Sequence, residues 1–199
     1  MAKKQRRGPP KWSIWPTKHA EVQELLQAEG ISFKFNPNDV DIDTDDGQSK
    51  EYDTKIMGRF VCHNQNCATS GWASKHICIT IRMYPGRQYN ARVYHQHCKR
   101  CNGISAPILD DSYAERVAYR LKVWSGLQMV KPPFTSKKSN GPHEEELCEG
   151  CQAGHCMKGQ NKDKNKEVRH IVPILDLKLP VLKLRLNIAS DISTVRTLL

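Results

Sequence analysis

The clearest pattern of hydrophobic and polar positions lies between residues 72 and 97. Every second residue is apolar in its centre, and polar or small residues lie between them: Ile77, Ile79, Ile81 and Met83 alternate with Cys78, Thr80 and Arg82. This period of two over a β-branched run predicts a strand with one buried face. Pro85-Gly86 is a turn signal, and the alternation resumes from Tyr89 to His97. The pattern predicts a β-hairpin.

Two amphipathic helices flank this hairpin in the sequence. The first is expected to open at Pro16-Thr17 and to end near Glu29, with Gly30 as its stop. Its inward side is narrow and predicts packing at the edge of the domain; it consists of Val22, Leu25, Leu26 and Glu29.

The second helix is expected to begin at Asp110-Asp111-Ser112 and to stop at Gly126. Ser112 and Glu115 have the spacing of a capping box. Its apolar side, formed by Val117, Leu121 and Trp124, is expected to cover the buried face of the hairpin. Close-spaced cysteine pairs lie just before and just after the hairpin, at Cys62 and Cys67 and at Cys98 and Cys101. The expected fold class is therefore α+β: a small zinc-ribbon-like antiparallel sheet with one or two covering helices and disordered basic tails.

The remaining segments are polar. Residues 38–53 are acidic and predict a surface loop, which is expected to lie against basic side chains; a calcium loop is excluded because Asp46 takes the glycine position. Residues 131–142 predict a linker, and 177–188 alternate like a strand around Pro180, with a surface strand or a tail as the alternatives. The predicted organisation is a disordered basic arm (1–15), a helix with the acidic loop (16–49), a zinc-binding domain (50–157), and a lysine-rich linker and tail (158–199).

Composition points to a stabilising device other than a large core. Mean hydropathy is −0.64 and 38% of the 199 residues are hydrophobic, which is low for a compact domain of this length. The net charge of +10 permits a nucleic acid, an anionic membrane or an acidic protein as partner and selects none of them. We find no secretory signal and no apolar run long enough to span a membrane, so we expect an intracellular, cytoplasmic protein, with the nucleus as the alternative.

Eight cysteines supply the candidate chemistry, and in a reducing compartment clustered cysteines indicate metal binding. Cys62 and Cys67 precede the hairpin, and Cys98 and Cys101 follow it. Because the hairpin returns the chain to where it began, these four residues are predicted to form one zinc site.

A second site is predicted within fourteen consecutive residues. Its ligands are His143, Cys148, Cys151 and Cys156, with His155 as a competing ligand. An alternative pairing, in which Cys148 and Cys151 join the first site, stays open. Two structural zinc ions are thus expected, because each site offers four ligands. Cys78 is expected to be a partly buried free thiol, and His95 and His97 to have structural or surface roles.

A catalytic zinc is not favoured. Such a site keeps one open position beside a general base. The deaminase pattern has a Glu two residues after its His, which Glu145 satisfies, but no proline precedes Cys148 and the histidine is too close to the cysteines.

Several of these segments together resemble the 3CxxC-type zinc-binding domain family, which includes the receptor-transporting proteins and many fungal proteins. They are Gly58-Arg-Phe-Val-Cys62, Trp72-Ala-Ser74, Ala91-Arg-Val-Tyr-His-Gln-His-Cys98 with Cys101, and His143 followed by Cys148-Glu-Gly-Cys151, Gly154 and Cys156. The stretch from Lys50 to Phe60 is similar to the fungal branch. The resemblance covers roughly residues 50–157 and implies zinc binding at the three cysteine pairs, accompanied by His143 and Cys156. It does not imply receptor transport. Those relatives carry a C-terminal membrane anchor, whereas the last segment of this sequence is expected to be too charged and too short to span a membrane. Their first cysteine pair also has two intervening residues where this chain has four.

Three functions compete. The first is a non-enzymatic zinc-stabilised interaction module, an adaptor or a folding and trafficking aid for a protein partner, using exposed aromatic residues such as Tyr84, Tyr94 and Trp124. The second is nucleic-acid (RNA) binding through a basic aromatic surface, formed by Arg87, Arg92, Lys99 and Arg100 with Tyr89 and Tyr94. The third, an enzyme, is the least favoured.

Overall fold

The computed structural model describes residues 9–130 and 142–156. The expectations for the first eight residues, for the linker and for everything after Cys156, including the alternating segment 177–188, lie outside these ranges.

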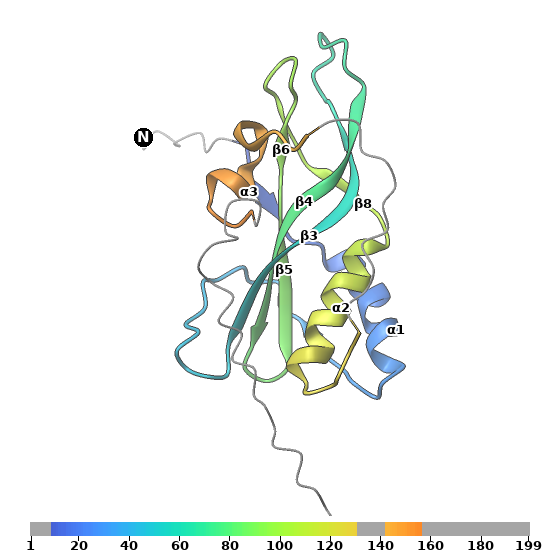
Figure 1. The fold of residues 1–199 in the computed structure, drawn as a ribbon, viewed down its shortest axis with the longest axis vertical. Helices are drawn as coiled ribbons and strands as arrows, with labels where there is room; N and C mark the ends of the chain where they lie inside the picture. Colours follow the sequence, from blue (N-terminus) through green and yellow to red (C-terminus); the bar gives the residue numbers. More distant parts are fainter. Residues whose placement is uncertain (1–8, 131–141, 157–199) are drawn as a thin grey trace, which may run out of the picture. The chain divides into compact units, whose positions relative to one another are not determined.

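The described residues form a curled sheet flanked by helices (Figure 1). In chain order the elements are β1 (Trp12–Ser13), η1 (Pro16–Lys18), α1 (His19–Gln27), β2 (Lys34–Phe35), β3 (Lys50–Val61), β4 (Gly71–Tyr84), β5 (Gln88–Tyr94), β6 (Gln96–His97), β7 (Ile104–Ser105), β8 (Pro107–Leu109), α2 (Ser112–Trp124), η2 (Glu145–Leu147) and α3 (Glu149–Gln152).

The main sheet has the order β1-β5-β4-β3-β8, and all these pairs are antiparallel. The short strand β2 joins β5 in parallel, and β6 pairs with β7 in a separate ribbon. The predicted β4–β5 hairpin is confirmed, with Tyr84 opposite Gln88 across its turn. The α+β class with an antiparallel sheet is confirmed as well.

Strand β3 is the main element that the sequence pattern missed. The acidic stretch was expected to be a loop as far as residue 53, but pairing with β4 begins at Lys50, which lies opposite Met83. Charged side chains at Glu51, Asp53 and Lys55 disguise the alternation with Tyr52, Thr54 and Ile56. The last part of the predicted basic arm is also a strand, since Trp12 and Ser13 pair with β5.

A β-bulge in β4 reverses its alternation. Ile56 pairs with Ile77 and Gly58 with Ser74, so two residues of β4 lie opposite the single Met57. Because of this extra residue, the alternation of side chains on one side of the bulge is opposite to that on the other side. Trp72 therefore lies on the face of Ile77, where its ring stacks on Phe60 with centroids 5.0 Å apart.

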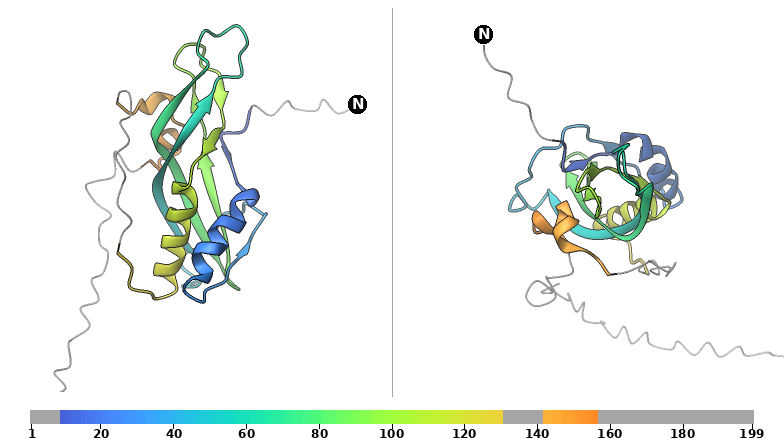
Figure 2. Two further views of the ribbon diagram at one scale, coloured as in Figure 1. Left: turned by 90° about the vertical axis from the view of Figure 1, so that its right-hand side faces the viewer. Right: turned by 90° about the horizontal axis from the view of Figure 1, so that it is seen from above.

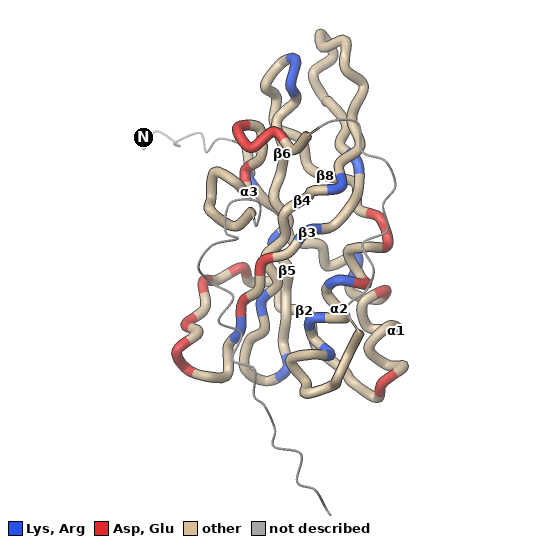
Figure 3. Tube along the Cα trace, in the orientation of Figure 1, with Lys and Arg blue, Asp and Glu red and all other residues tan. Residues whose placement is uncertain are grey.

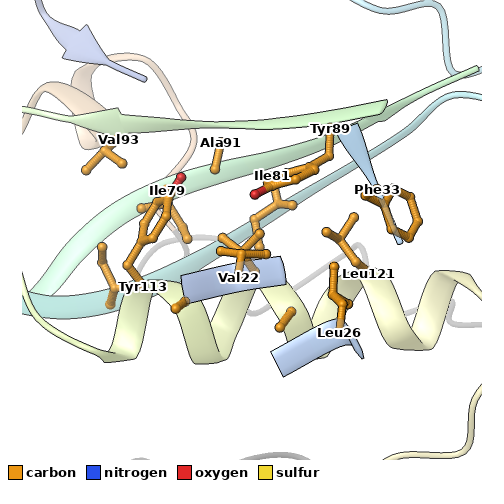
Figure 4. Close-up of a cluster of buried hydrophobic side chains, with 14 of the residues drawn as sticks. Val22, Leu26, Phe33, Ile79, Ile81, Tyr89, Ala91, Val93, Tyr113 and Leu121 are labelled. Carbon is orange, nitrogen blue, oxygen red and sulfur yellow. The ribbon is translucent and has the colours of Figure 1, made fainter. Parts of the chain in front are cut away.

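The hydrophobic core lies between the sheet and the two long helices (Figures 2 and 4). From α1 it receives Val22 and Leu26, and from α2 it receives Val117 and Leu121, all of them fully buried. α1 was expected to pack at the edge of the domain; it packs beside α2, its Val22 and Leu26 reach into the core, and Leu25 remains exposed. One core thus joins the N-terminal segment to the predicted zinc-binding domain.

The start of α2 differs from the predicted capping box. The helix has Asp111 as its N-cap residue, and no side chain caps it. The Ser112 hydroxyl instead accepts a hydrogen bond from the Met57 backbone N–H (2.8 Å) and donates one to Asp110. Ser112 therefore anchors the helix to β3, opposite the bulge. The helix ends before Gly126, whose φ of +88° is the left-handed conformation that glycine tolerates best.

The second face of the hairpin is buried too, which corrects the expectation of a single buried face. Cys78, Thr80 and Arg82 have exposed fractions of 1%, 0% and 3%. The acidic loop before β3, where acidic positions follow one another (Figure 3), covers the Arg82 end of this face. Asp39 of this loop and Glu51 at the start of β3 bind the guanidinium. The loop therefore lies against basic side chains, as expected.

Two of the three aromatic residues expected at the surface are buried. Tyr84 is 7% exposed and Tyr94 is 2% exposed. Trp124 is partly buried and packs against the core. The expected aromatic interaction face is therefore absent from the described residues in the form that the sequence indicated.

His95 makes the stability of this edge depend on pH. It is buried, and its Nε2 lies 2.9 Å from the hydroxyl of Ser13 in β1. Burial lowers the pKa of His95, so the unfolded chain binds the proton more readily. Stability contributed by the neutral ring is present above the ordinary histidine pKa and is lost as pH falls through the lower folded-state pKa.

We expect acidification from about pH 7.5 to about 5.5 to destabilise the wild type more than His95→Gln. The measurement is urea unfolding of both proteins at the two pH values. Protonation of the zinc ligands affects both proteins equally, so an identical pH dependence would contradict the assignment to His95.

Candidate metal centres

The first centre lies where two chain turns meet. Cys62 and Cys67 lie in the turn that joins β3 to β4, and Cys98 and Cys101 lie between β6 and β7. Their four sulfurs all lie within 4.8 Å of one another. The sequence placed the two cysteine pairs at the ends of the β4–β5 hairpin. The structure adds that Cys62 and Cys67 also lie in the turn of a second hairpin, formed by β3 and β4.

The backbone of the second turn prepares Cys98 to be a thiolate. Burial opposes ionisation, but the N–H groups of Cys101 and Arg100 donate to the sulfur and bring the pKa of Cys98 down to about 6. The Gly103 N–H likewise lowers the pKa of Cys101. A thiolate is the form that binds a metal.

The sulfur spacing fits zinc. Cys67 Sγ and Cys98 Sγ are 3.8 Å apart, and Cys62 Sγ and Cys101 Sγ are 3.5 Å apart. A tetrahedron with zinc–sulfur bonds of about 2.3 Å places its sulfurs about 3.8 Å apart. These four residues would hold a zinc ion through four thiolates.

The second centre gathers His143, Cys148, Cys151 and Cys156, again within 4.8 Å of one another. His143 Nε2 lies 3.1 Å from Cys151 Sγ and 3.5 Å from Cys156 Sγ. In a zinc tetrahedron these nitrogen–sulfur distances are about 3.6 Å. The local pairing is therefore the one the structure has, and the alternative pairing of Cys148 and Cys151 with the first site does not occur.

The thiols of the second centre influence each other's ionisation. Hydrogen bonding from Cys148 and Cys78 lowers the pKa of Cys156, and closeness to the Cys156 sulfur raises the pKa of Cys148. Ionisation of all three thiols at this spacing requires a cation to neutralise them, which a bound Zn²⁺ would supply.

The two centres are connected by a short polar link. His97, next to Cys98, lies 2.7 Å from the Glu149 carboxylate, and Glu149 follows Cys148. The Glu149 N–H donates to the His95 carbonyl (3.1 Å). Burial alone would raise the pKa of Glu149, but hydrogen bonds from His97 and Lys11 outweigh it and lower that pKa. His95 and His97 are thus structural, as expected.

The remaining candidate ligands have other partners. His155 Nδ1 lies 3.0 Å from Asp53 Oδ1, and its ring stacks on Tyr94. His155, Asp53 and Glu51 form a third group of potential metal ligands, but the Glu51 carboxylate already binds Arg82 (2.7 Å). His155 therefore supports the second centre from its flank and is not part of the four-ligand set.

Cys78 is the residue whose surroundings the sequence misjudged. It was expected to lie away from any cysteine pair. Instead it belongs to a buried cluster with Tyr94, Cys148 and Cys156, and its Sγ donates to the His155 carbonyl (3.1 Å). Only the packing of α3 on β4 creates this neighbourhood, so local spacing contained no signal for it.

His76 was missed for the same reason. Its Nε2 lies 3.1 Å from Cys156 Sγ, and its ring stacks on His143 with centroids 4.2 Å apart. It is one of the two β4 residues that lie opposite Met57 in the bulge, which the alternation pattern did not reveal.

Gly150 allows α3 to approach β4. A Cβ atom at this position would lie 2.5 Å from Cys78 Cβ and 2.9 Å from its Sγ. We expect Gly150→Ala to cost about 3 kcal/mol and to weaken zinc binding at the second centre. The measurement is chelator competition.

Gly154→Ala is the matched control in the same segment. A Cβ atom at this position would meet nothing within 4 Å, but the backbone φ is +79°. The substitution should therefore cost about 1 kcal/mol of backbone strain. If Gly150→Ala and Gly154→Ala retained zinc equally well, the predicted clash between residue 150 and Cys78 would be contradicted.

The four basic residues predicted to bind nucleic acid do not form one surface. Arg87 lies in the turn before β5, whereas Lys99 and Arg100 follow β6 at the other end. Arg92 is engaged by Asp39 (2.9 Å) and lies over the Trp12 ring, and Lys99 pairs with Glu144 (2.8 Å). This arrangement does not supply a continuous basic patch.

A cleft of about 310 Å³ lies between the two centres. Residues 72–76 of β4 line one side, and residues 142–144 with Leu147 line the other. Gln96, His97 and Lys99 complete it. His143 faces both the cleft and the second centre, so the cleft reaches a metal ligand.

None of the helices in residues 9–130 and 142–156 is long and apolar enough to cross a membrane. Searches of curated proteins and of solved structures find no match. A family model described as a zinc-binding domain, the 3CxxC zinc ribbon, matches residues 55–154, which is half of the chain and contains seven of the eight ligands. With its two four-ligand centres in place, the chain belongs to the 3CxxC zinc-ribbon family of zinc-binding domains.

Proposed function

We propose that the protein is a non-enzymatic interaction module in which two structural zinc ions hold a binding surface for another protein. It would act as an adaptor or as a folding and trafficking aid. The observation that carries this proposal is that each centre supplies four protein ligands, the number that fills a structural zinc tetrahedron. Because zinc needs reduced cysteines, we place the protein inside the cell, in the cytoplasm or alternatively in the nucleus.

The cleft between the centres is the surface that we assign to the partner. Both of its walls depend on a zinc centre, since one is β4 after the first turn and the other carries His143. The exposed Ala73 leaves space in the cleft for a partner residue, and the neighbouring Trp72 is held in place by its stacking on Phe60. An extended protein segment fits such a groove better than a nucleic acid, because Lys99 is already paired with Glu144.

The test is quantitative affinity purification with two surface variants. Ala73→Arg fills the cleft, and Leu25→Arg makes the same kind of change on exposed α1. We expect the wild type and Leu25→Arg to recover the same proteins in similar amounts. With Ala73→Arg the recovered amount should fall roughly tenfold, which corresponds to a loss of about 1.4 kcal/mol in binding free energy. Both variants must retain two zinc ions and the wild-type melting temperature.

Equal recovery with both variants would refute the cleft as the partner site. Recovery of RNA that falls steeply with salt would instead favour the nucleic-acid alternative.

A further inference from the structure

A fourth cysteine lies beside the three thiol ligands of the second centre. Cys78 is 1% exposed and packs with Cys148 and Cys156 in one buried cluster. The backbone of α3 passes directly over it at Gly150, between the ligands Cys148 and Cys151. The first centre has no additional thiol among the described residues, because all of the other described cysteines are already candidate ligands.

The cleft gives a small oxidant a path to Cys156. His76 and His143 both line the cleft, and their Nε2 atoms lie 3.1 and 3.5 Å from Cys156 Sγ. Zinc-bound thiolates remain nucleophilic, and thiolates are the species that peroxides oxidise. Cys156 therefore lies behind two side chains that line the cleft, and it packs in one cluster with the Cys78 thiol.

We propose that the second centre is a redox-sensitive zinc site, in which peroxide converts Cys78 and Cys156 to a disulfide and zinc is released. This goes beyond the interaction function, and it holds whatever partner the cleft binds.

The chemistry balances in two steps. The Cys156 thiolate attacks hydrogen peroxide: an S–O bond forms, the O–O bond breaks, and hydroxide leaves to become water on taking up a proton. The Cys78 thiol then attacks the sulfenic sulfur: the S–S bond forms, the S–O bond breaks, and the thiol proton leaves with the hydroxyl as water. Two thiol sulfurs lose two electrons, and the peroxide becomes two water molecules. Zinc loses one of its four ligands, and a dithiol reductant restores both thiols.

The experiment treats the full chain, loaded with two zinc ions, with hydrogen peroxide. Released zinc is followed with a colorimetric chelator, and disulfides are mapped by mass spectrometry without reduction. We expect release of one of the two ions, a Cys78–Cys156 disulfide, and recovery of binding after dithiothreitol and added zinc.

Cys78→Ser and Cys78→Ala serve as variants, since serine keeps a donor for the His155 carbonyl and alanine does not. With either variant, we expect Cys156 to proceed to sulfinic acid and zinc binding not to recover. The same oxidised species in wild type and variants would overturn the proposal. So would a wild-type disulfide between other cysteines, a result that decides the matter even if neither variant folds.

Discussion

Replacement of Cys98 by serine is expected to unfold the protein under conditions in which the wild type is folded. Cys98 is fully buried, and its sulfur lies 3.8 Å from that of Cys67 in the first centre. Structural zinc sites have apparent binding free energies of about 10–16 kcal/mol, comparable with the whole stability of a domain, about 5–15 kcal/mol. Loss of this centre also releases the β3–β4 turn and the β6–β7 ribbon from each other. The measurements are native mass spectrometry for zinc and circular dichroism for folding.

The control for this variant is Cys78→Ser, which removes a thiol outside the four-ligand sets. It is expected to keep two zinc ions and to melt close to the wild type. A strong chelator should unfold the wild type, because removal of the zinc ion has the same effect as the expected loss of the site in Cys98→Ser. A wild type with fewer than two zinc ions, or a Cys98→Ser variant that melts normally, would contradict the structural role.

Replacement of Asp39 by alanine is expected to have the next largest effect, about 3–5 kcal/mol. Its carboxylate accepts hydrogen bonds from Arg82 (3.1 Å), Arg92 (2.9 Å) and the Trp12 indole (2.6 Å). The side chains of Arg82 and Arg92 are only 4% and 11% exposed. Removal of the anion leaves two poorly solvated guanidinium groups short of negative charge. Guanidinium chloride unfolding in excess zinc measures the loss.

Asp41→Ala is the matched control, since Asp41 contacts the same Arg82 guanidinium at 3.3 Å but is 90% exposed. An exposed ion pair contributes less than about 1 kcal/mol. If the two variants cost the same, the acidic loop would not stabilise the fold through the buried contacts of Asp39.

The sequence predicted both metal centres because their geometry is nearly local. The first depends on a hairpin that returns the chain to its start, and the alternation of the isoleucines from Ile77 onward revealed that hairpin. The second lies within fourteen residues, so close spacing alone indicated it, although the choice between local and exchanged pairing needed coordinates. Helix α2 was equally legible, since Val117 and Leu121 repeat at helical spacing and are buried.

The errors about burial concern which segment covers which surface. Burial of Cys78, Thr80 and Arg82 requires α3 and the acidic loop to pack on β4, and neither segment is adjacent to β4 in the chain. Polar side chains on that face indicate solvent when only the strand is considered. They are buried because each has a distant partner: Asp53 for Thr80 (2.6 Å) and Asp39 for Arg82.

The sequence by itself thus determined the candidate metal ligands, the central hairpin and the covering helix, because spacing and periodicity are properties of neighbouring residues. Only the tertiary structure decided that β3 completes the sheet, that a bulge turns Trp72 inward, and that Cys78 and His76 lie beside the second centre. These features depend on contacts between distant segments, and the bulge depends on one extra residue in the pairing of two strands. The cleft and the redox-sensitive cysteine pair follow from those contacts.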